Sequence, residues 1–232
     1  MSGEKIVDLV MLTYNRLEYT QMTLESMMTV DCGIPWDRVN FCIVDNASTD
    51  DTRQYIDEFK AQTRFIDQIY RSPKNTGVVG GFAYFRFNML SGARYLGKVD
   101  NDSIFHADWL KNLINALDAF PKLGVVGAQS QGLAAAVLDP AGDNAVKRGN
   151  VGYFPARFVG GRFLARANIF HTRPMPSRGK IFGWTAYQQK LKCSIGWCYP
   201  PALIEHVGDK HSMHPKAIKN DTYARYRKEV RS

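Results

Sequence analysis

The chain has 232 residues, enough for one domain with a sizeable core and too few for two large domains. Hydrophobic residues make up 45% of the chain and charged residues 22%, which excludes disorder along its whole length. The formal net charge of +8 favours anionic partners such as nucleotide diphosphates, nucleic acid or anionic lipid surfaces. Charge alone does not choose among these classes.

The cysteines and the N-terminal residues bear on the cellular compartment. Cys32, Cys42, Cys193 and Cys198 form no CxxC pair and no complete metal-ligand group, so we expect reduced, partly buried thiols. Residues 1–12 have no long apolar core with a cleavage site, and no apolar run approaches the roughly 20 residues of a membrane span. We therefore expect a cytoplasmic protein without a transmembrane segment, with peripheral membrane attachment as a second expectation.

Strand and helix signals alternate along the first half of the chain. Short apolar runs predict strands over residues 6–12, 39–44, 65–70 and 95–99, and helical spacing predicts helices over 17–28, 51–59 and 82–89. In the second half we expect a helix over 109–120, a strand over 124–128, a loop over 129–150, a strand and short helix over 157–170, a helix over 181–192 and a strand over 196–207. The alternation predicts an α/β fold with a mostly parallel sheet and helices on both faces.

Polar clusters follow three of the predicted strands, at residues 13–16, 45–48 and 100–102. In α/β sheets, ligands bind beyond the carboxyl ends of the strands. We therefore expect the three clusters to meet at one edge of the sheet and to form a binding site there.

The cluster Asp100-Asn101-Asp102 has the chemistry of a metal site. Carboxylate oxygens are hard ligands suited to Mg²⁺ or Mn²⁺, and such an ion can bridge the two phosphates of a nucleotide diphosphate. The same triplet suits a turn, so alone it is weak evidence. His206, at the end of the last predicted strand, is a candidate further ligand as a neutral imidazole, with a surface or partly buried histidine as the alternative.

Two other clusters are candidates for nucleotide contacts. Asp45 directly follows an apolar strand and can accept hydrogen bonds from a base or ribose, or cap the next helix, or both. The stretch Asn75-Thr76-Gly77 predicts a loop where backbone can approach a ligand closely, with a plain turn as the alternative.

The order of these motifs resembles glycosyltransferase family 2. The motifs are VMLTYNR at residues 10–16, IVDNASTD at 43–50, NTG at 75–77 and VDND at 99–102. The resemblance is strong over roughly residues 6–110 and weaker through 160–164 and 183–208. It implies a Rossmann-like GT-A fold with a smaller acceptor-side subregion. It also implies an inverting, metal-dependent transfer from a nucleotide-diphosphate sugar, with a UDP-sugar favoured and Mn²⁺ or Mg²⁺ as cofactor.

The resemblance also assigns parts of the chain and roles of residues. We expect one GT-A domain over residues 1–212, with a nucleotide-sugar-binding half (1–102), an acceptor half (103–212) and a basic helix or tail over 213–232. The residues expected at the donor nucleotide are Thr13, Tyr14, Asn15, Arg16, Asp45, Asn46, Asn75, Gly77 and Asp100. Asp102 is the expected direct metal ligand, with Asp100 and His206 as further metal contacts.

The general base is missing from its expected place. Many family members carry an acidic pair at the start of the helix before the last strands, and its aspartate takes the acceptor's proton. Residues 182–188 contain no carboxylate here. The candidates elsewhere are Asp209 and Glu205, then Asp139 and Asp143. Three alternatives need no other base. The acceptor hydroxyl needs little assistance in losing its proton, or the acidic pair of the family does not align with residues 182–188, or the protein binds a donor without fast transfer. Trp184 and Tyr187 in this stretch either stack on a sugar or base on the acceptor side, or pack within a helix.

The acceptor and the competing classes stay open at this point. A glycan, a lipid-linked sugar, a protein or a modified DNA base, as for some phage enzymes, are all compatible acceptors. The basic tail favours an anionic surface or nucleic acid, with a solvated helix as the alternative. A nucleotidyltransferase is disfavoured because no Gly-rich phosphate loop stands near the N-terminus. A non-catalytic nucleotide- or nucleic-acid-binding module remains an alternative, because residues 182–188 lack the carboxylate expected of a general base.

Overall fold

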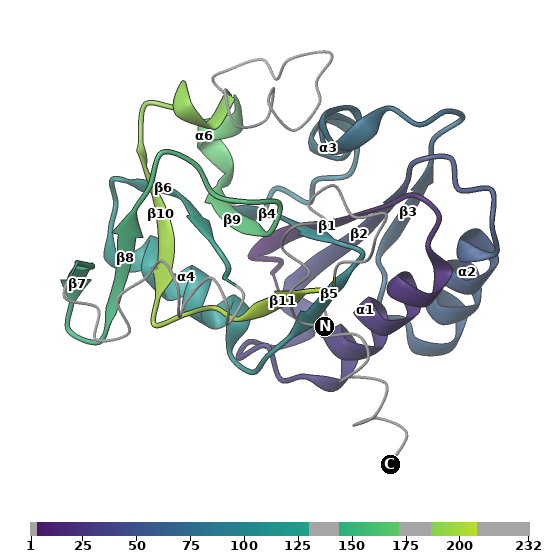
Figure 1. Cartoon of the computed structure of the whole chain (residues 1–232), viewed down its shortest axis with the longest axis horizontal. Coiled ribbons are helices and arrows are strands. Elements are labelled where there is room, and N and C mark those ends of the chain that lie inside the picture. The colour runs from purple at the N-terminus through teal and green to yellow at the C-terminus, as the bar shows by residue number, and fades with distance from the viewer. Residues whose placement is uncertain (1–3, 130–143, 172–186, 208–232) are drawn as a thin grey trace.

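The computed structural model describes residues 4–129, 144–171 and 187–207 (Figure 1). The N-terminal half alternates strands with helices: β1 (Val7–Thr13), α1 (Leu17–Thr29), η1 (Trp36–Arg38), β2 (Val39–Asp45), α2 (Thr52–Thr63), β3 (Gln68–Arg71), α3 (Gly77–Asn88) and β4 (Tyr95–Asp100). The four strands and three α-helices expected there are confirmed. Every residue of β1 and β2 is buried, as expected for strands that are covered on both faces.

The C-terminal half is less regular. Its elements are β5 (Ser103–Phe105), α4 (Trp109–Ala119), β6 (Leu123–Gly127), β7 (Val146–Arg148), β8 (Val151–Pro155), β9 (Phe163–Arg166), α6 (Ala167–His171), β10 (Ser194–Tyr199) and β11 (Ile204–His206). The expected loop over 129–150 is wrong at 146–148, which pair with β8 as a strand, while 130–143 lie outside the described residues. The single strand expected over 196–207 is two strands, because Pro200 and Pro201 have no N–H for a ladder. Of the helix expected over 181–192, the described residues show 187–189 as helical.

Among the described residues, nine strands form one sheet in the order β3-β2-β1-β4-β9-β6-β10-β8-β7. Strands β1 to β4 are mutually parallel where they pair, as expected. Beyond β4 the sheet is mixed, because β9 runs antiparallel to both β4 and β6. Strands β5 and β11 form a separate antiparallel pair, which lies in front of the large sheet in Figure 1.

Helices cover both faces of the sheet (Figure 1). One apolar cluster joins the sheet to α1, α2 and α4, with Trp109 and Leu113 of α4 among its buried members. The other joins it to α3 and α6 through Phe82 and Phe170, whose ring centroids lie 5.7 Å apart. The loops that follow the carboxyl ends of β1, β2 and β4 form the site described below.

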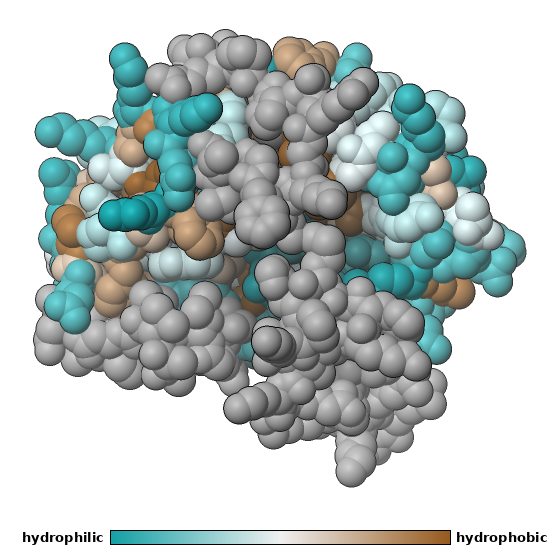
Figure 2. Space-filling model, turned by 45° about the horizontal axis from the view of Figure 1, so that its top comes forward, coloured by the Kyte–Doolittle hydropathy of each residue, from teal (hydrophilic) through white to brown (hydrophobic). Residues whose placement is uncertain are grey.

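The described surface is mixed in character. On the face in Figure 2, brown residues lie in small groups among teal and white ones, so the described residues form no broad apolar patch there. The exposed large hydrophobic side chains come from separate elements: Tyr14, Met28, Phe87, Val146 and Phe158. No helix within the described ranges is long and apolar enough to span a membrane.

The four cysteines are free thiols that differ in exposure: Cys193 is partly exposed and the other three are buried. Burial raises the pKa of Cys42 and of Cys198 to about 12. At pH 8 their thiolate fractions are therefore on the order of 10⁻⁴, and only thiolates react. We expect a thiol reagent to label Cys193 of the native protein first, and Cys42 and Cys198 only after unfolding. Peptide mapping checks this, and rapid native labelling of Cys42 would contradict it.

Candidate active site

The three polar clusters meet at one edge of the sheet, as expected. Strands β2 and β4 flank β1 on its two sides and run parallel to it. The register pairs Thr13 with Asp45 and Leu12 with Asp100. Three strands therefore end side by side, and the loops that follow them share one surface.

Hydrogen bonds tie the loop after β1 to the loop after β2. The backbone N–H of Asn15 donates to Oγ of Ser48 at 2.7 Å, and the N–H of Thr49 donates to Oδ1 of Asn15 at 2.7 Å. Asn15 and Arg16 have φ of 54° and 68°, a left-handed conformation that these bonds hold in place. Asn15 was expected at the nucleotide, and in this structure its side chain secures the loop.

Asp45 is also engaged within the protein. Its side chain is 1% exposed; Oδ1 accepts from the N–H of Ser48 at 3.0 Å and Oδ2 from Nε of Arg53 at 2.6 Å. These contacts hold the turn after β2, whereas the helix cap expected as the alternative is not formed, because α2 begins at Thr52 with Asp51 as its N-cap residue. Because a carboxylate has about four lone-pair sites, a base would have to share these oxygens.

Asn46 joins the third loop to the other two. Its Oδ1 accepts from the N–H and the hydroxyl of Thr76 at 3.1 and 2.9 Å, and its Nδ2 donates to the carbonyl of Gly77 at 3.0 Å. Oδ1 of Asn75 accepts from the N–H of Gly77 at 2.8 Å. Gly77 has a φ of 68°, a conformation that glycine adopts without strain. The loop is therefore held rigidly beside the site.

Thr13 and Tyr14 differ sharply in exposure. Thr13 is buried, and its hydroxyl accepts from Nδ2 of Asn101 at 3.0 Å; the same Nδ2 donates to Oγ1 of Thr20 at 3.0 Å. Asn101, the middle residue of the triplet, therefore fastens β4 to β1 and α1. Tyr14 is 45% exposed, so its ring is open to a ligand.

Asp102 lies at the centre of the site. Its Oδ2 accepts from Nη1 of Arg16 at 2.9 Å and lies 3.2 Å from Nε2 of His206. Its Oδ1 is buried and has no hydrogen-bond partner among the described residues. The pairing of β11 with β5 sets His206 opposite Ser103, so the structure brings the expected histidine to the expected aspartate.

Asp100 has a different environment from Asp102. Its Oδ1 pairs with Nζ of Lys98, a lysine that is 2% exposed and also donates to the carbonyl of Gly161 at 3.1 Å. Burial opposes ionisation of Asp100, but the positive charges of Lys98 and Arg162 outweigh it and hold the pKa of Asp100 below its ordinary value. Asp100 is therefore an ionised carboxylate with a cation of the chain already beside it.

This site suits a divalent metal ion that is coordinated jointly by protein side chains and a bound ligand. Among the described residues, no group of three or more His, Cys, Asp or Glu side chains is placed to hold an ion by itself. Mg²⁺-type sites, however, commonly use one or two protein carboxylates together with substrate phosphates. The unpartnered Oδ1 of Asp102, with His206 beside it, provides such an incomplete ligand set. Asp100 is directed to Lys98, so its metal contact stays a prediction.

The expected acceptor-side residues are described only in part. Trp184, Asp209, Asp139 and Asp143 lie outside the described residues. Tyr187 is 5% exposed, and its ring stacks on that of Phe170 with the ring centroids 6.1 Å apart. These contacts favour packing within the protein over stacking on a sugar or base.

Glu205 is the candidate base that the structure does describe. It precedes His206 on β11 and pairs with Ile104 of β5. Successive side chains of a strand point to opposite faces, so Glu205 and His206 lie on opposite faces of this ladder. Because His206 is the one beside Asp102, this arrangement argues against Glu205 as the base.

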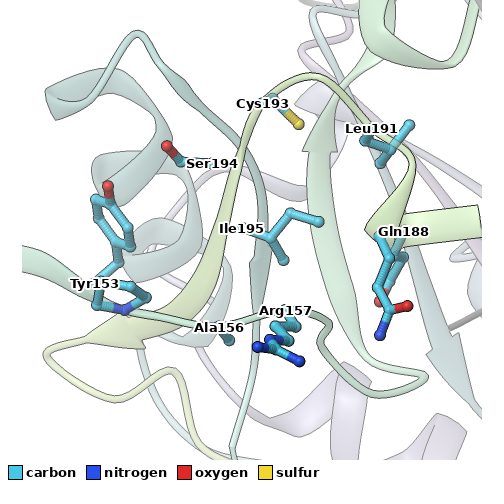
Figure 3. Close-up of a pocket in the computed structure, with 10 residues that line it drawn as sticks. Tyr153, Ala156, Arg157, Gln188, Leu191, Cys193, Ser194 and Ile195 are labelled. Carbon is cyan, nitrogen blue, oxygen red and sulfur yellow. The ribbon is translucent and has the colours of Figure 1, made fainter. Parts of the chain in front are cut away.

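A separate pocket of about 500 Å³ lies against β8 and β10 (Figure 3). Gln188 lines it, is fully buried, and accepts at Oε1 from the N–H of Val159 at 3.0 Å. Its Nε2 has no partner among the described residues. Strands β9 and β6 lie between β4 and this pocket in the sheet, so it is distinct from the edge with Asp102. No sequence signal named it as a site.

The comparison with protein families decides what kind of site this edge is. A family model described as Glycosyl transferase family 2 matches residues 8–179. The chain belongs to this family. The match confirms the resemblance drawn from the four motifs. No curated protein sequence matches the chain.

Solved structures share the fold of the family member at low identity. A mannosyltransferase from Pyrobaculum calidifontis, in complex with GDP-Man and Mn²⁺, has a TM-score of 0.70 at 17% identity, covering 100% of this chain and 66% of its own. S. aureus TarS 1-349 in complex with UDP-GlcNAc has a TM-score of 0.61 at 14% identity, covering 93% and 62%. GalNAc-T7 with UDP, GalNAc and Mn²⁺ has a TM-score of 0.65 at 8% identity, covering 89% and 44%. The chain thus spans two thirds or less of these proteins. The likeness confirms the expected GT-A α/β fold.

Proposed function

We propose that this family member transfers a sugar from a nucleotide-diphosphate donor to an acceptor hydroxyl, with inversion by in-line displacement at the anomeric carbon. One observation carries the proposal. At the edge where β1, β2 and β4 end, Asp102 keeps a buried carboxylate oxygen without a partner, with His206 beside its other oxygen. An anionic donor that brings a metal would complete this site.

The side chains at the edge have complementary roles in this proposal. The exposed ring of Tyr14 packs against the nucleobase, and Arg16, which lies 4.2 Å over the ring of Tyr19, places positive charge beside the diphosphate. Asp102 and His206 would hold Mn²⁺ or Mg²⁺, and the bound ion would offset the charge on the leaving diphosphate. Asn101 keeps these groups in position by joining β4 to β1 and α1.

The donor class is supported by the solved structures, two of which are described with Mn²⁺. Their donors or products include GDP-Man, UDP-GlcNAc and UDP. We keep a UDP-sugar as the favoured donor and test GDP-sugars beside it. We also keep residues 1–102 as the donor half, 103–212 as the acceptor half, and Asp209 as the proposed base. The basic segment 213–232 lies outside the described residues, and its role at an anionic surface stays a prediction.

A donor panel tests the function. We expect release of UDP or GDP from at least one nucleotide sugar in the presence of Mn²⁺, and loss of that release when EDTA removes the metal. Thermal unfolding in parallel reports binding, since a ligand present at 100 times its Kd stabilises the folded state by about 2.7 kcal/mol. Donor binding without release of diphosphate would favour the non-catalytic module. Neither binding nor release with any donor would overturn the proposal.

A further inference from the structure

Arg162 presents unused hydrogen-bond donors at the active-site edge. It directly precedes β9, whose first residue, Phe163, pairs with Lys98 of β4. Its Nε and Nη1 are buried and have no hydrogen-bond partner among the described residues. Unsatisfied buried donors on a charged group are costly, and most native ones are satisfied. A ligand at this edge would satisfy them.

The backbone at Gly161, just before Arg162, lies close against Asp100. A Cβ added to Gly161 would lie 2.4 Å from Oδ2 of Asp100, so this segment passes directly against the carboxylate. Nζ of Lys98 donates to the carbonyl of Gly161 at 3.1 Å, and the N–H of Ala128 donates to the carbonyl of Arg162 at 3.0 Å. The backbone of Gly161 and Arg162 is therefore held on one side by Lys98 of β4 and on the other by Ala128, which follows β6.

The charges at this edge are unevenly paired. Lys98 forms an ion pair with Asp100, and Arg16 forms one with Asp102. Arg162 is close enough to Asp100 to act on its ionisation, yet no ion pair of Arg162 is found in the described part of the chain. A guanidinium has a planar fork of donors that matches phosphate geometry, and its charge persists in a buried site.

We propose that Arg162 binds the diphosphate of the nucleotide-sugar donor and stabilises it as the leaving group. The inference rests on the proposed function. As the acceptor oxygen forms its bond to the anomeric carbon, the bond from that carbon to the phosphate oxygen breaks and its electron pair stays on the phosphate. Arg162 donates hydrogen bonds to this oxyanion and keeps its proton. Such donors act most strongly where charge develops in the transition state.

Variants of Arg162 separate this role from a structural one. Arg162→Gln removes the charge and Arg162→Lys keeps it. Arg157→Gln is the matched control, because Arg157 is exposed on the same segment and lies at the separate pocket.

Calorimetric titration with UDP, GDP, uridine and guanosine, each with Mn²⁺, measures whether binding needs the phosphates. For Arg162→Gln we expect the Kd of whichever diphosphate binds the wild type to rise about 10- to 100-fold, as for a lost charged hydrogen bond. Nucleoside binding should be unchanged, and Arg162→Lys should recover part of the loss.

Several results would overturn the assignment. Equal diphosphate binding by wild type and Arg162→Gln would remove Arg162 from the diphosphate while leaving the proposed function intact. Equal weakening of diphosphate and nucleoside, together with a lowered Tm, would show a structural role instead. A similar loss in Arg157→Gln would show a general charge effect. A wild type that binds neither UDP nor GDP would overturn this inference and the proposed function together.

Discussion

Replacing Asp102 with asparagine is expected to lower kcat/KM for donor turnover by about 10³-fold, equivalent to about 4 kcal/mol of transition-state stabilisation. The substitution keeps the shape of the side chain and removes its charge. Oδ1 loses the charge that suits a cation, and Oδ2 loses its ion pair with Arg16. Initial rates of UDP or GDP release at saturating Mn²⁺ measure the effect.

The control for Asp102→Asn is Asp37→Asn. Asp37 is exposed and lies on η1, just before the start of β2. Because the site follows the end of β2, Asp37 is at the opposite edge of the sheet. We expect Asp37→Asn to keep wild-type rates and the wild-type dependence on Mn²⁺ concentration. Asp102→Asn should in addition need a higher Mn²⁺ concentration for half-maximal activity. An Asp102→Asn protein with full activity would show that neither the metal nor the leaving group depends on this carboxylate.

The edge where β1, β2 and β4 end could be predicted from sequence because its determinants are local. A buried parallel strand has a continuous apolar run, and the polar cluster that ends it marks the carboxyl edge. Residues 10–16, 43–50 and 99–102 each combine the two, so their convergence followed from the parallel order of β1, β2 and β4. Sequence did not separate residues that hold the loops from residues that face a ligand. Asn15, Asp45 and Asn46 were all expected at the nucleotide, and their side-chain hydrogen bonds are made within the protein.

The other half of the site depends on pairings between distant segments. His206 reaches Asp102 because β11 pairs with β5, a three-residue strand that carries too little pattern to be predicted. Arg162 reaches Asp100 because β9 inserts antiparallel between β4 and β6.

One signal for this half was present in the sequence. Lys98 stands within the apolar run of β4, and lysine is almost never fully buried unless it is paired. Its 2% exposure and its pairing with Asp100 bear this out. Its second contact, the carbonyl of Gly161, marks the segment that carries Arg162. A charged residue inside a predicted buried strand thus pointed to a partner, although not to which one.

The glycine doublet before Arg162 allows the sharpest test of how this part of the site is built. A methyl group at Gly161 would lie 2.4 and 2.9 Å from the carboxylate oxygens of Asp100, closer than real Cβ atoms come. Gly161→Ala must therefore displace Asp100 or the segment that carries Arg162. At Gly160 the nearest atom is in the ring of Trp197 at 3.8 Å, an ordinary contact. Gly160→Ala is therefore the control from the adjacent residue.

We expect Gly161→Ala to lower kcat/KM about 10- to 100-fold, since small misplacements of a catalytic group cost about 10²-fold. Gly160→Ala should stay close to wild type. Both proteins should keep a cooperative unfolding transition, because both positions adopt backbone conformations open to alanine. Nucleotide release and Tm, measured on both variants, check this. Equal kcat/KM values for Gly161→Ala and Gly160→Ala would mean that the contact between Gly161 and Asp100 does not organise the site. A loss of activity confined to Gly161→Ala would show that residues 100–102 depend on the segment that places Arg162.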